Sequence, residues 1–296
     1  MLYVNDSAIW KESTPYVKDA GLWKPAKQVY TRSSGVWKEV MLLNLYQQLD
    51  KLGLTSNLRL CLDAGAAASL PTGSTKWLDL SGGGYDFFRG VTVGAEGSDP
   101  TINGTANARS SAEFLSFDGG DYLTYDSANE GWMNNFHKAG AQWTVATWIW
   151  YAASTSAGFI GTNGNSVSPG FAVGMNGSGK LATIVHNNST QIINNATAAS
   201  IPTGGWCFLA NSFDSSGGAT GNILAINGAY ETATATLNSP SASNAAVTMQ
   251  IGSRANGTVP LPNGSRMAGF MIWEGRALNQ AELTAVFNAT RVRFGV

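Results

Sequence analysis

The sequence predicts a mainly β protein, in which an antiparallel β-sandwich follows a set of β-hairpin repeats and one short helix. Three observations predict this fold class. Only 12% of the residues are charged, against about a quarter in typical proteins, and 35 residues are glycine. From about residue 57, short apolar runs alternate with turns rich in Gly, Asn and Ser, as in sandwiches. The chain is also 44% hydrophobic and contains ten tryptophans, which is enough for a core.

Residues 1–40 contain three related segments, each with a tyrosine seven residues before a tryptophan. In the second segment, residues 16–18 and 22–24 predict two strands, and residues 19–21 predict a three-residue turn with a left-handed glycine. We expect the Tyr and the Trp to face each other across each hairpin. Isolated hairpins of this size are marginal in water, so they need a partner surface. The residues assigned to attachment and oligomerisation here are Tyr3, Trp10, Tyr16, Trp23, Tyr30 and Trp37.

Residues 41–56 predict a short helical neck. Its leucines recur at spacings of three, four and three, which is typical of a helical seam, and Gly53 is a suitable end. The seam covers about a heptad and a half, less than the ~3–4 heptads of an independent coiled coil. Two interpretations remain open: the helix packs on the following domain, or it joins three copies of the chain as a homotrimer. The seam residues are Leu42, Leu45, Leu49 and Leu52.

Residues 57–296 predict the sandwich. Apolar runs of strand length recur between turns, and only residues 277–291 have a helical pattern. There, Asn279 and Glu282 form a capping-box pattern at the start of the helix. The predicted strands are 114–119, 122–126, 143–151, 170–176, 180–187, 206–214, 222–228, 246–253 and 267–275.

Several motifs in this segment carry a family resemblance. An apolar strand ends in Leu-Asp-Ala-Gly at residues 62–65, Trp-Leu-Asp-Leu-Ser-Gly follows at 77–82, and Phe-Asp-Gly-Gly-Asp-Tyr stands at 117–122. With WTVATWIW and the C-terminal strand and helix, they resemble laminin-G-like, concanavalin-A-like lectin domains of bacterial and phage proteins. The resemblance covers residues 57–296 and implies a jelly-roll topology. The loop after Leu80 departs from the family, since Gly83 and Tyr85 stand where Asn is usual.

The N-terminal repeats carry a second resemblance. Copies of Tyr-Val-Lys-Asp-x-Gly-x-Trp-Lys are similar to those that open many tailed-phage structural proteins. Together, the two resemblances imply a virion appendage, a tail or head fibre. Residues 1–40 would attach it to other virion proteins, and the sandwich would bind host-surface polysaccharide. The expected location is the virion, after synthesis in the host cytoplasm, because the start of the sequence shows no secretory signal.

Composition excludes several other partners. The net charge is −1 and no basic run occurs, so we expect no nucleic acid. No segment approaches the ~18 apolar residues of a membrane span. Cys61 and Cys207 lie in apolar runs, which leaves two alternatives: buried free thiols, or a disulfide between neighbouring strands.

The candidate chemistry is sparse, and we expect no enzyme and no cofactor. Glycoside hydrolysis needs two carboxylates across a cleft, and no such acid pair is visible in the sequence. Calcium needs six or more oxygen ligands, and only Asp118 and Asp121, with Asp126 nearby, cluster in sequence. Calcium is therefore a candidate that we do not favour.

Sugar binding needs a concave surface with polar groups for hydroxyls. The candidate glycan-binding residues are Asn163, Asn165, His186, Asn187 and Asn188, although Asn is also a common turn residue. Three functions remain: a non-enzymatic fibre that binds glycan, a purely structural virion decoration or connector protein, and a polysaccharide-degrading hydrolase. The first is preferred, because the acid pair that the third requires is missing.

Overall fold

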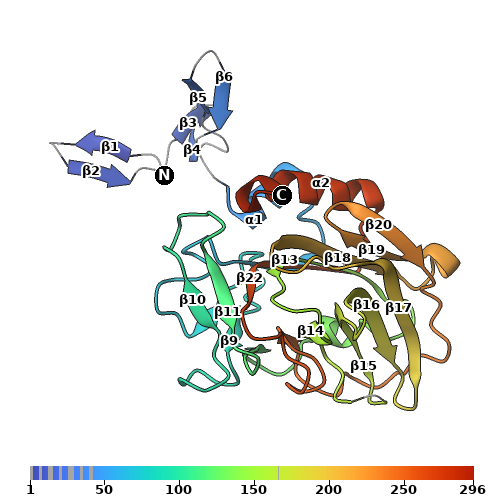
Figure 1. Cartoon of the computed structure of the whole chain (residues 1–296). Helices are drawn as coiled ribbons and strands as arrows, with labels where there is room; N and C mark the ends of the chain where they lie inside the picture. Colours follow the sequence, from blue (N-terminus) through green and yellow to red (C-terminus); the bar gives the residue numbers. More distant parts are fainter. Residues whose placement is uncertain are drawn as a thin grey trace.

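A computed structural model describes residues 43–165 and 167–296 in full, together with the backbone of six short strands between residues 3 and 39. Those six strands form three separate two-stranded hairpins (Figure 1). The pairs are β1 (Tyr3–Asp6) with β2 (Ile9–Glu12), β3 (Tyr16–Asp19) with β4 (Leu22–Pro25), and β5 (Tyr30–Ser33) with β6 (Val36–Glu39). The predicted hairpin strands are thus confirmed.

The register of the hairpins differs from the prediction. Asp19 pairs with Leu22, so two residues link the strands instead of three. With this shorter link, Trp23 pairs with Lys18 and not with Tyr16, and the other two hairpins have the same offset. The expected direct Tyr–Trp pairing is therefore wrong: each Tyr and Trp occupy diagonal positions. The side chains of these six aromatic residues, and Leu42, lie outside the described residues.

Two eight-stranded antiparallel sheets form the sandwich, and the mainly β prediction is confirmed. We name the first the helix-covered sheet, and its strands run β10-β11-β22-β13-β18-β19-β20, with β7 also paired to β22. The second, the open sheet, has the order β17-β16-β15-β14-β21-β12-β9-β8. The helix-covered sheet contains β7 (Leu58–Asp63), β10 (Thr101–Asn103), β11 (Phe114–Phe117), β13 (Gln142–Trp150), β18 (Trp206–Asp214), β19 (Asn222–Ile226), β20 (Ala229–Ala233) and β22 (Ser265–Glu274). The open sheet contains β8 (Lys76–Trp77), β9 (Phe87–Arg89), β12 (Leu123–Tyr125), β14 (Ala157–Gly161), β15 (Gly170–Met175), β16 (Lys180–His186), β17 (Gln191–Ser200) and β21 (Gln250–Ile251).

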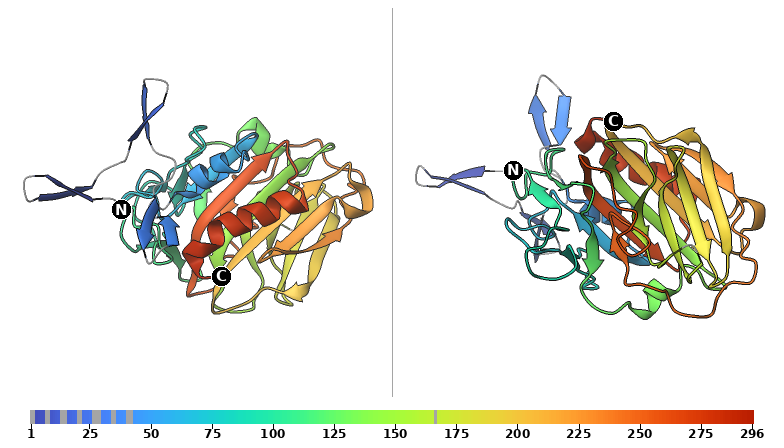
Figure 2. Two further views of the ribbon diagram at one scale, coloured as in Figure 1. Left: turned by 90° about the horizontal axis from the view of Figure 1, so that it is seen from above. Right: turned by 60° about the horizontal axis from the view of Figure 1, so that its bottom comes forward.

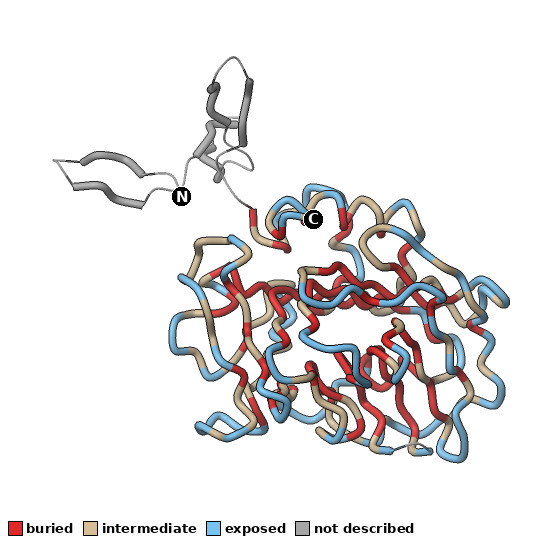
Figure 3. The backbone as a smooth tube through the Cα atoms, in the orientation of Figure 1, coloured by how far each residue is buried: buried red, intermediate tan, exposed pale blue. Residues whose placement is uncertain are grey.

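The main core lies between the two sheets, whose strands carry most of the buried residues (Figure 3). Phe136 stacks on Phe171 with ring centroids 4.3 Å apart, and Trp143 stacks on Phe213 at 5.1 Å. Strand β13 explains the continuous apolar run WTVATWIW. Trp143 faces this core, while Trp148 faces the opposite side of the same sheet and is also fully buried. A sheet that is buried on both faces does not need alternating polar residues.

A second core covers the outer face of the helix-covered sheet. Helices α1 (Leu45–Lys51) and α2 (Gln280–Thr290) lie side by side across this face (Figures 1 and 2). The short helix η3 (Arg291–Phe294) follows α2, and two other 3₁₀ turns, η1 (Gly131–Asn134) and η2 (Gly218–Thr220), lie in loops. The indole N–H of Trp148 donates to the Thr290 hydroxyl at 2.8 Å, and that of Trp273 donates to the Leu54 carbonyl at 2.7 Å. Helix α2 and the segment that follows α1 therefore satisfy the polar atoms of these buried tryptophans.

This packing answers the question left open for the leucine seam. Leu45 and Leu49 are 1% and 0% exposed within the second core, whereas Leu52 is 37% exposed. Helix α1 is thus part of the globular unit, and the prediction of a separate neck over residues 41–56 is corrected. In this arrangement Leu45 and Leu49 do not face another chain. Both capping boxes are present, at Asn44 and at the predicted Asn279, and Gly53 follows α1 in the left-handed region.

The Leu-Asp-Ala-Gly motif has a structural explanation. Asp63 is fully buried, and its carboxylate accepts hydrogen bonds from the backbone N–H of Leu45 and of Gly65. It also pairs with the Arg293 guanidinium at 2.5 Å. A Cβ on Gly65 would lie 2.5 Å from that guanidinium and 2.9 Å from the backbone Cα of Arg109, which favours glycine at this position. One buried carboxylate therefore joins β7, the start of α1 and the C-terminal segment.

Both cysteines are buried free thiols, so the first alternative is confirmed. Cys61 lies in the second core and Cys207 in the main core, on opposite faces of one sheet. Burial raises the pKa of the Cys207 thiol to about 12 and also raises that of Cys61. No helix among the described residues is long and apolar enough to cross a membrane.

Candidate functional site

Three of the predicted glycan-binding residues lie together at one end of the open sheet. The Asn165 carbonyl accepts from the Asn163 side chain at 3.2 Å and lies 3.0 Å from Nδ1 of His186. Asn163 and His186 are 0% and 3% exposed, and Asn165 caps its own loop by accepting from the backbone N–H of Val167 and Ser168. These side chains therefore build the loop, although Oδ1 of Asn163 is buried without a hydrogen-bond partner.

Asn187 and Asn188 form the turn between β16 and β17. The Asn187 carboxamide accepts from the backbone N–H of Ser189 and Thr190, and Asn188 has a φ of 82°. Short polar side chains tolerate this left-handed conformation. The structure thus gives both residues a turn function that is sufficient to explain them.

The candidate metal ligands Asp118 and Asp121 belong to one tight turn. Asp121 accepts from the Asp118 backbone N–H at 2.8 Å, and Asp118 accepts from that of Gly120 at 2.8 Å. Asp126 is paired with Lys76 at 2.6 Å. Burial, and to a lesser extent the charges of Asp118 and Asp99, raise the pKa of Asp121 to about 6. Within the described residues, no three His, Cys, Asp or Glu side chains are grouped as a metal site.

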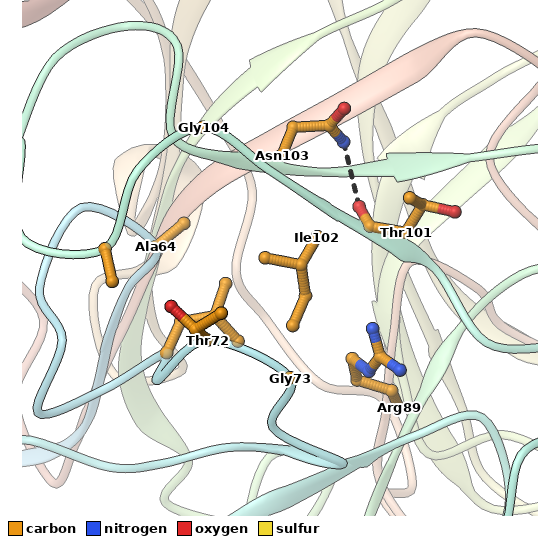
Figure 4. Close-up of a pocket in the computed structure, with 10 residues that line it drawn as sticks. Ala64, Thr72, Gly73, Arg89, Thr101, Ile102, Asn103 and Gly104 are labelled. Carbon is orange, nitrogen blue, oxygen red and sulfur yellow. Dashed lines mark hydrogen bonds between the residues drawn. The ribbon is translucent and has the colours of Figure 1, made fainter.

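A pocket opens where the edges of the two sheets meet. Its volume is about 340 Å³, at the lower end of the range for small-molecule sites. Strand β10, the outermost strand of the helix-covered sheet, forms one wall, and β9 and the loop before β8 form the others (Figure 4). The lining residues are Ala64, Leu70, Thr72, Gly73, Arg89, Thr101, Ile102, Asn103, Gly104 and Ala106.

The pocket combines an aliphatic floor with polar groups and one cation. Ile102 projects into it between Thr72 and the guanidinium of Arg89 (Figure 4). The Asn103 side chain donates to the Thr101 carbonyl at 2.9 Å and to the Ser116 hydroxyl at 3.0 Å, which holds the carboxamide in place. No lining residue is acidic or aromatic. The pocket can therefore bind a small polar ligand, but its own side chains offer no carboxylate for acid–base chemistry.

A second hollow of about 310 Å³ lies beside η1 and the start of β13. Its one lining carboxylate, Glu274, is paired with Arg59 at 3.3 Å and accepts from the Asn135 side chain. Neither of these two hollows contains the pair of carboxylates that glycoside hydrolysis requires.

Sequence reasoning missed the edge pocket. Strands β9 and β10 are three residues long, and their residues have no periodicity that distinguishes them from loops. Arg89 follows two phenylalanines and precedes a glycine with a φ of 81°, but nothing in that local pattern indicates a ligand site. The pocket exists because segments around residues 70, 89 and 102 are brought together by the sheets.

Comparisons with known proteins agree with this architecture. The family model of the concanavalin A-like lectin/glucanases superfamily, laminin G type, matches residues 117–284. The receptor-binding domain of botulinum neurotoxin type G is similar at a TM-score of 0.51 and 15% identity, over 78% of this chain and 51% of that one. A Trypanosoma rangeli sialidase in complex with sialic acid is similar at a TM-score of 0.51 and 12% identity, over 80% of this chain and 34% of that one. No curated protein matches the chain.

These comparisons define the fold and leave the site to its geometry. At such low identities, the structural similarity shows the fold alone. This chain spans about half of the toxin fragment and a third of the sialidase. The family match begins at residue 117, after every residue that lines the edge pocket. The chemistry of that pocket must therefore be argued from its own residues.

Proposed function

Because this chain belongs to the concanavalin A-like lectin/glucanase superfamily, we propose that its sandwich is a non-enzymatic glycan-binding module. In this proposal the module forms the outer part of a virion appendage, a tail or head fibre, and binds host-surface polysaccharide. The hairpin repeats of residues 1–40 attach it to other virion proteins, in agreement with their resemblance to phage structural repeats.

The edge pocket is the observation that carries the glycan-binding proposal. It offers hydroxyl, amide and backbone groups, which can bind sugar hydroxyls. Beside them lie aliphatic side chains, which can contact the C–H groups of a sugar ring. Among the described strands β10 pairs with β11 alone, so its other edge is open to a ligand, apart from the Thr101 carbonyl that Asn103 engages. The small volume suits one terminal or branching sugar unit better than a long stretch of chain.

Multivalency would compensate for the weakness of one small site. If three chains assemble, linked binding raises the overall avidity by roughly 10²–10⁴ without any new contact. Since Leu45 and Leu49 are buried in their own domain, residues 1–40 are the segment to which we assign assembly. Deleting residues 1–40 should yield a monomer by mass photometry, whereas the full chain should be a trimer. Equal numbers of chains per particle in the two proteins would contradict this assignment.

Glycan binding is tested with two matched substitutions. Thr72 lines the pocket at an exposed position of the loop before β8, and Thr190 is exposed on the turn after β16. On a glycan array, Thr72→Trp should abolish binding by filling the pocket, and Thr190→Trp should leave it intact. The opposite result would move the site to the predicted asparagine loop. A blank array for the unmodified chain would favour the purely structural role, and release of reducing ends would favour the hydrolase.

The appendage role is tested on particles. An antibody against the sandwich should label intact virions, and a chain that lacks residues 1–40 should be absent from them. Labelling that survives the deletion would show that the hairpins are not the attachment segment.

A further inference from the structure

The geometry of the edge pocket points to a carboxylate-bearing sugar as its ligand, and we propose that Arg89 is the residue that binds the carboxylate. This inference rests on the proposed glycan-binding function and names the substrate class of the same site. It depends on the state of Arg89, on the other lining residues and on the size of the pocket.

Arg89 is a partly buried cation without an ionic partner. Its Nη1 donates to the Pro100 carbonyl at 3.2 Å, but its Nε is buried and makes no hydrogen bond. The ion pairs among the described residues do not include Arg89, so no described carboxylate lies within 4.0 Å of it. A desolvated charge with unused donors is costly, and an anionic ligand would supply the missing acceptors.

The acids of the following loop are engaged with that loop. Glu96 accepts from the Val91 backbone N–H at 2.9 Å and from the Thr92 hydroxyl, and these hydrogen bonds lower its pKa. Asp99 accepts from the Glu96 backbone N–H at 3.1 Å. Oδ1 of Asp99 is buried without a hydrogen bond, but neither carboxylate forms an ion pair with Arg89 among the described residues.

The lining residues favour an acidic sugar over a neutral one. Neutral sugars gain much of their binding energy when a ring lies against an aromatic side chain, and none of the ten lining residues is aromatic. Ile102 and Leu70 offer only aliphatic contact. The guanidinium is therefore the strongest recognition group in the pocket, because charge-assisted hydrogen bonds are roughly twice as strong as neutral ones.

The geometry of one guanidinium favours a carboxylate over a sulfate. A planar guanidinium matches a planar carboxylate with two parallel hydrogen bonds. Arg89 is the one cation among the ten lining residues, which balances the single charge of a sugar acid. With about 340 Å³ available, the ligand is a single acidic unit at the end or branch of a chain.

The test compares acidic oligosaccharides with their carboxyl-reduced counterparts. Probes are a glucuronic-acid oligosaccharide, a sialylated trisaccharide, the reduced form of each and a sulfated neutral oligosaccharide, with affinities measured by calorimetry on the full chain. We expect the unmodified chain to bind at least one acid tenfold or more tighter than its reduced form. Arg89→Gln should remove that difference, Arg89→Lys should retain part of it, and higher salt should diminish it.

Controls separate this inference from the proposed function. Arg291→Gln removes the same charge from an exposed position on η3 and should change no affinity. The melting temperature of Arg89→Gln shows whether this variant is folded. If Arg89→Gln is unfolded, the comparison uses Arg89→Lys, which keeps the positive charge and should retain part of the preference for the acidic probe. Equal binding of acidic and reduced probes, or a preference for the sulfated one, would overturn the inference but leave glycan binding standing. If no probe binds and the array is also blank, both proposals fail.

Discussion

Replacing Asp63 by alanine tests the explanation of the Leu-Asp-Ala-Gly motif. The Asp63 carboxylate is 0% exposed and pairs with Arg293, whose side chain is 6% exposed. It also accepts from the Leu45 N–H at 2.9 Å and from the Gly65 N–H at 2.8 Å. The substitution therefore removes the partner of a buried cation and the acceptor of two backbone donors at once.

The expected loss of stability follows from these contacts. Removing one partner of a buried ion pair costs about 3–5 kcal/mol, because the other charge stays buried and uncompensated. A buried donor left without an acceptor costs about 1–3 kcal/mol. These contributions are not additive, since Arg293 keeps its hydrogen bonds to the Ser110 and Glu113 carbonyls. We expect Asp63→Ala to lower the free energy of unfolding by about 4 kcal/mol.

The assay is urea unfolding of the full chain followed by tryptophan fluorescence. The control is Arg59→Gln, which breaks the Arg59–Glu274 pair, with 43% of the Arg59 side chain exposed. It should cost less than about 1 kcal/mol. In the double variant with Arg293→Met, the loss should be smaller than the sum of the single losses by about 1–3 kcal/mol. If Asp63→Ala costs no more than Arg59→Gln, or if the losses of the double variant add, the motif does not act through this ion pair.

Three further predictions concern the helix, the acidic turn and the thiols. Leu49→Ala should lower the free energy of unfolding by about 2–5 kcal/mol, and Leu52→Ala by less than about 1 kcal/mol, because only Leu49 is fully buried; a change in chain association without a loss of domain stability would contradict this packing. Because the folded pKa of Asp121 is raised to about 6, its proton stabilises the fold below about pH 4, and that stability is lost as the pH rises through 6. Urea unfolding at pH 4 and pH 7 should show that the unmodified chain loses about 2–3 kcal/mol more than Asp121→Asn over this interval, and equal losses would refute the raised pKa. Cys61 and Cys207 should react with a thiol reagent only after unfolding, since both are buried with raised pKa values, and rapid labelling of the native chain would refute their burial.

Local patterns in the sequence were sufficient for most elements of the fold. The apolar runs of residues 143–151 and 206–214 became β13 and β18, because long runs bounded by turn residues have few other stable states. The helix cap at Asn279 was also predictable from the sequence, since a capping box depends only on two residues three positions apart. The run 246–253 was less reliable: only Gln250 and Ile251 form a strand.

Tertiary structure decided what each apolar face covers and where a ligand can enter. The spacing of Leu45 and Leu49 identifies a helical face, but only the outer tryptophans of the helix-covered sheet decide that this face packs inside the chain. Likewise, Arg89 belongs to a pocket only because β9 and β10, from different sheets, meet at the sandwich edge. The physical reason is the same in both cases. Periodicity in a sequence shows which side of an element avoids water, whereas contacts between distant segments select the partner that covers it.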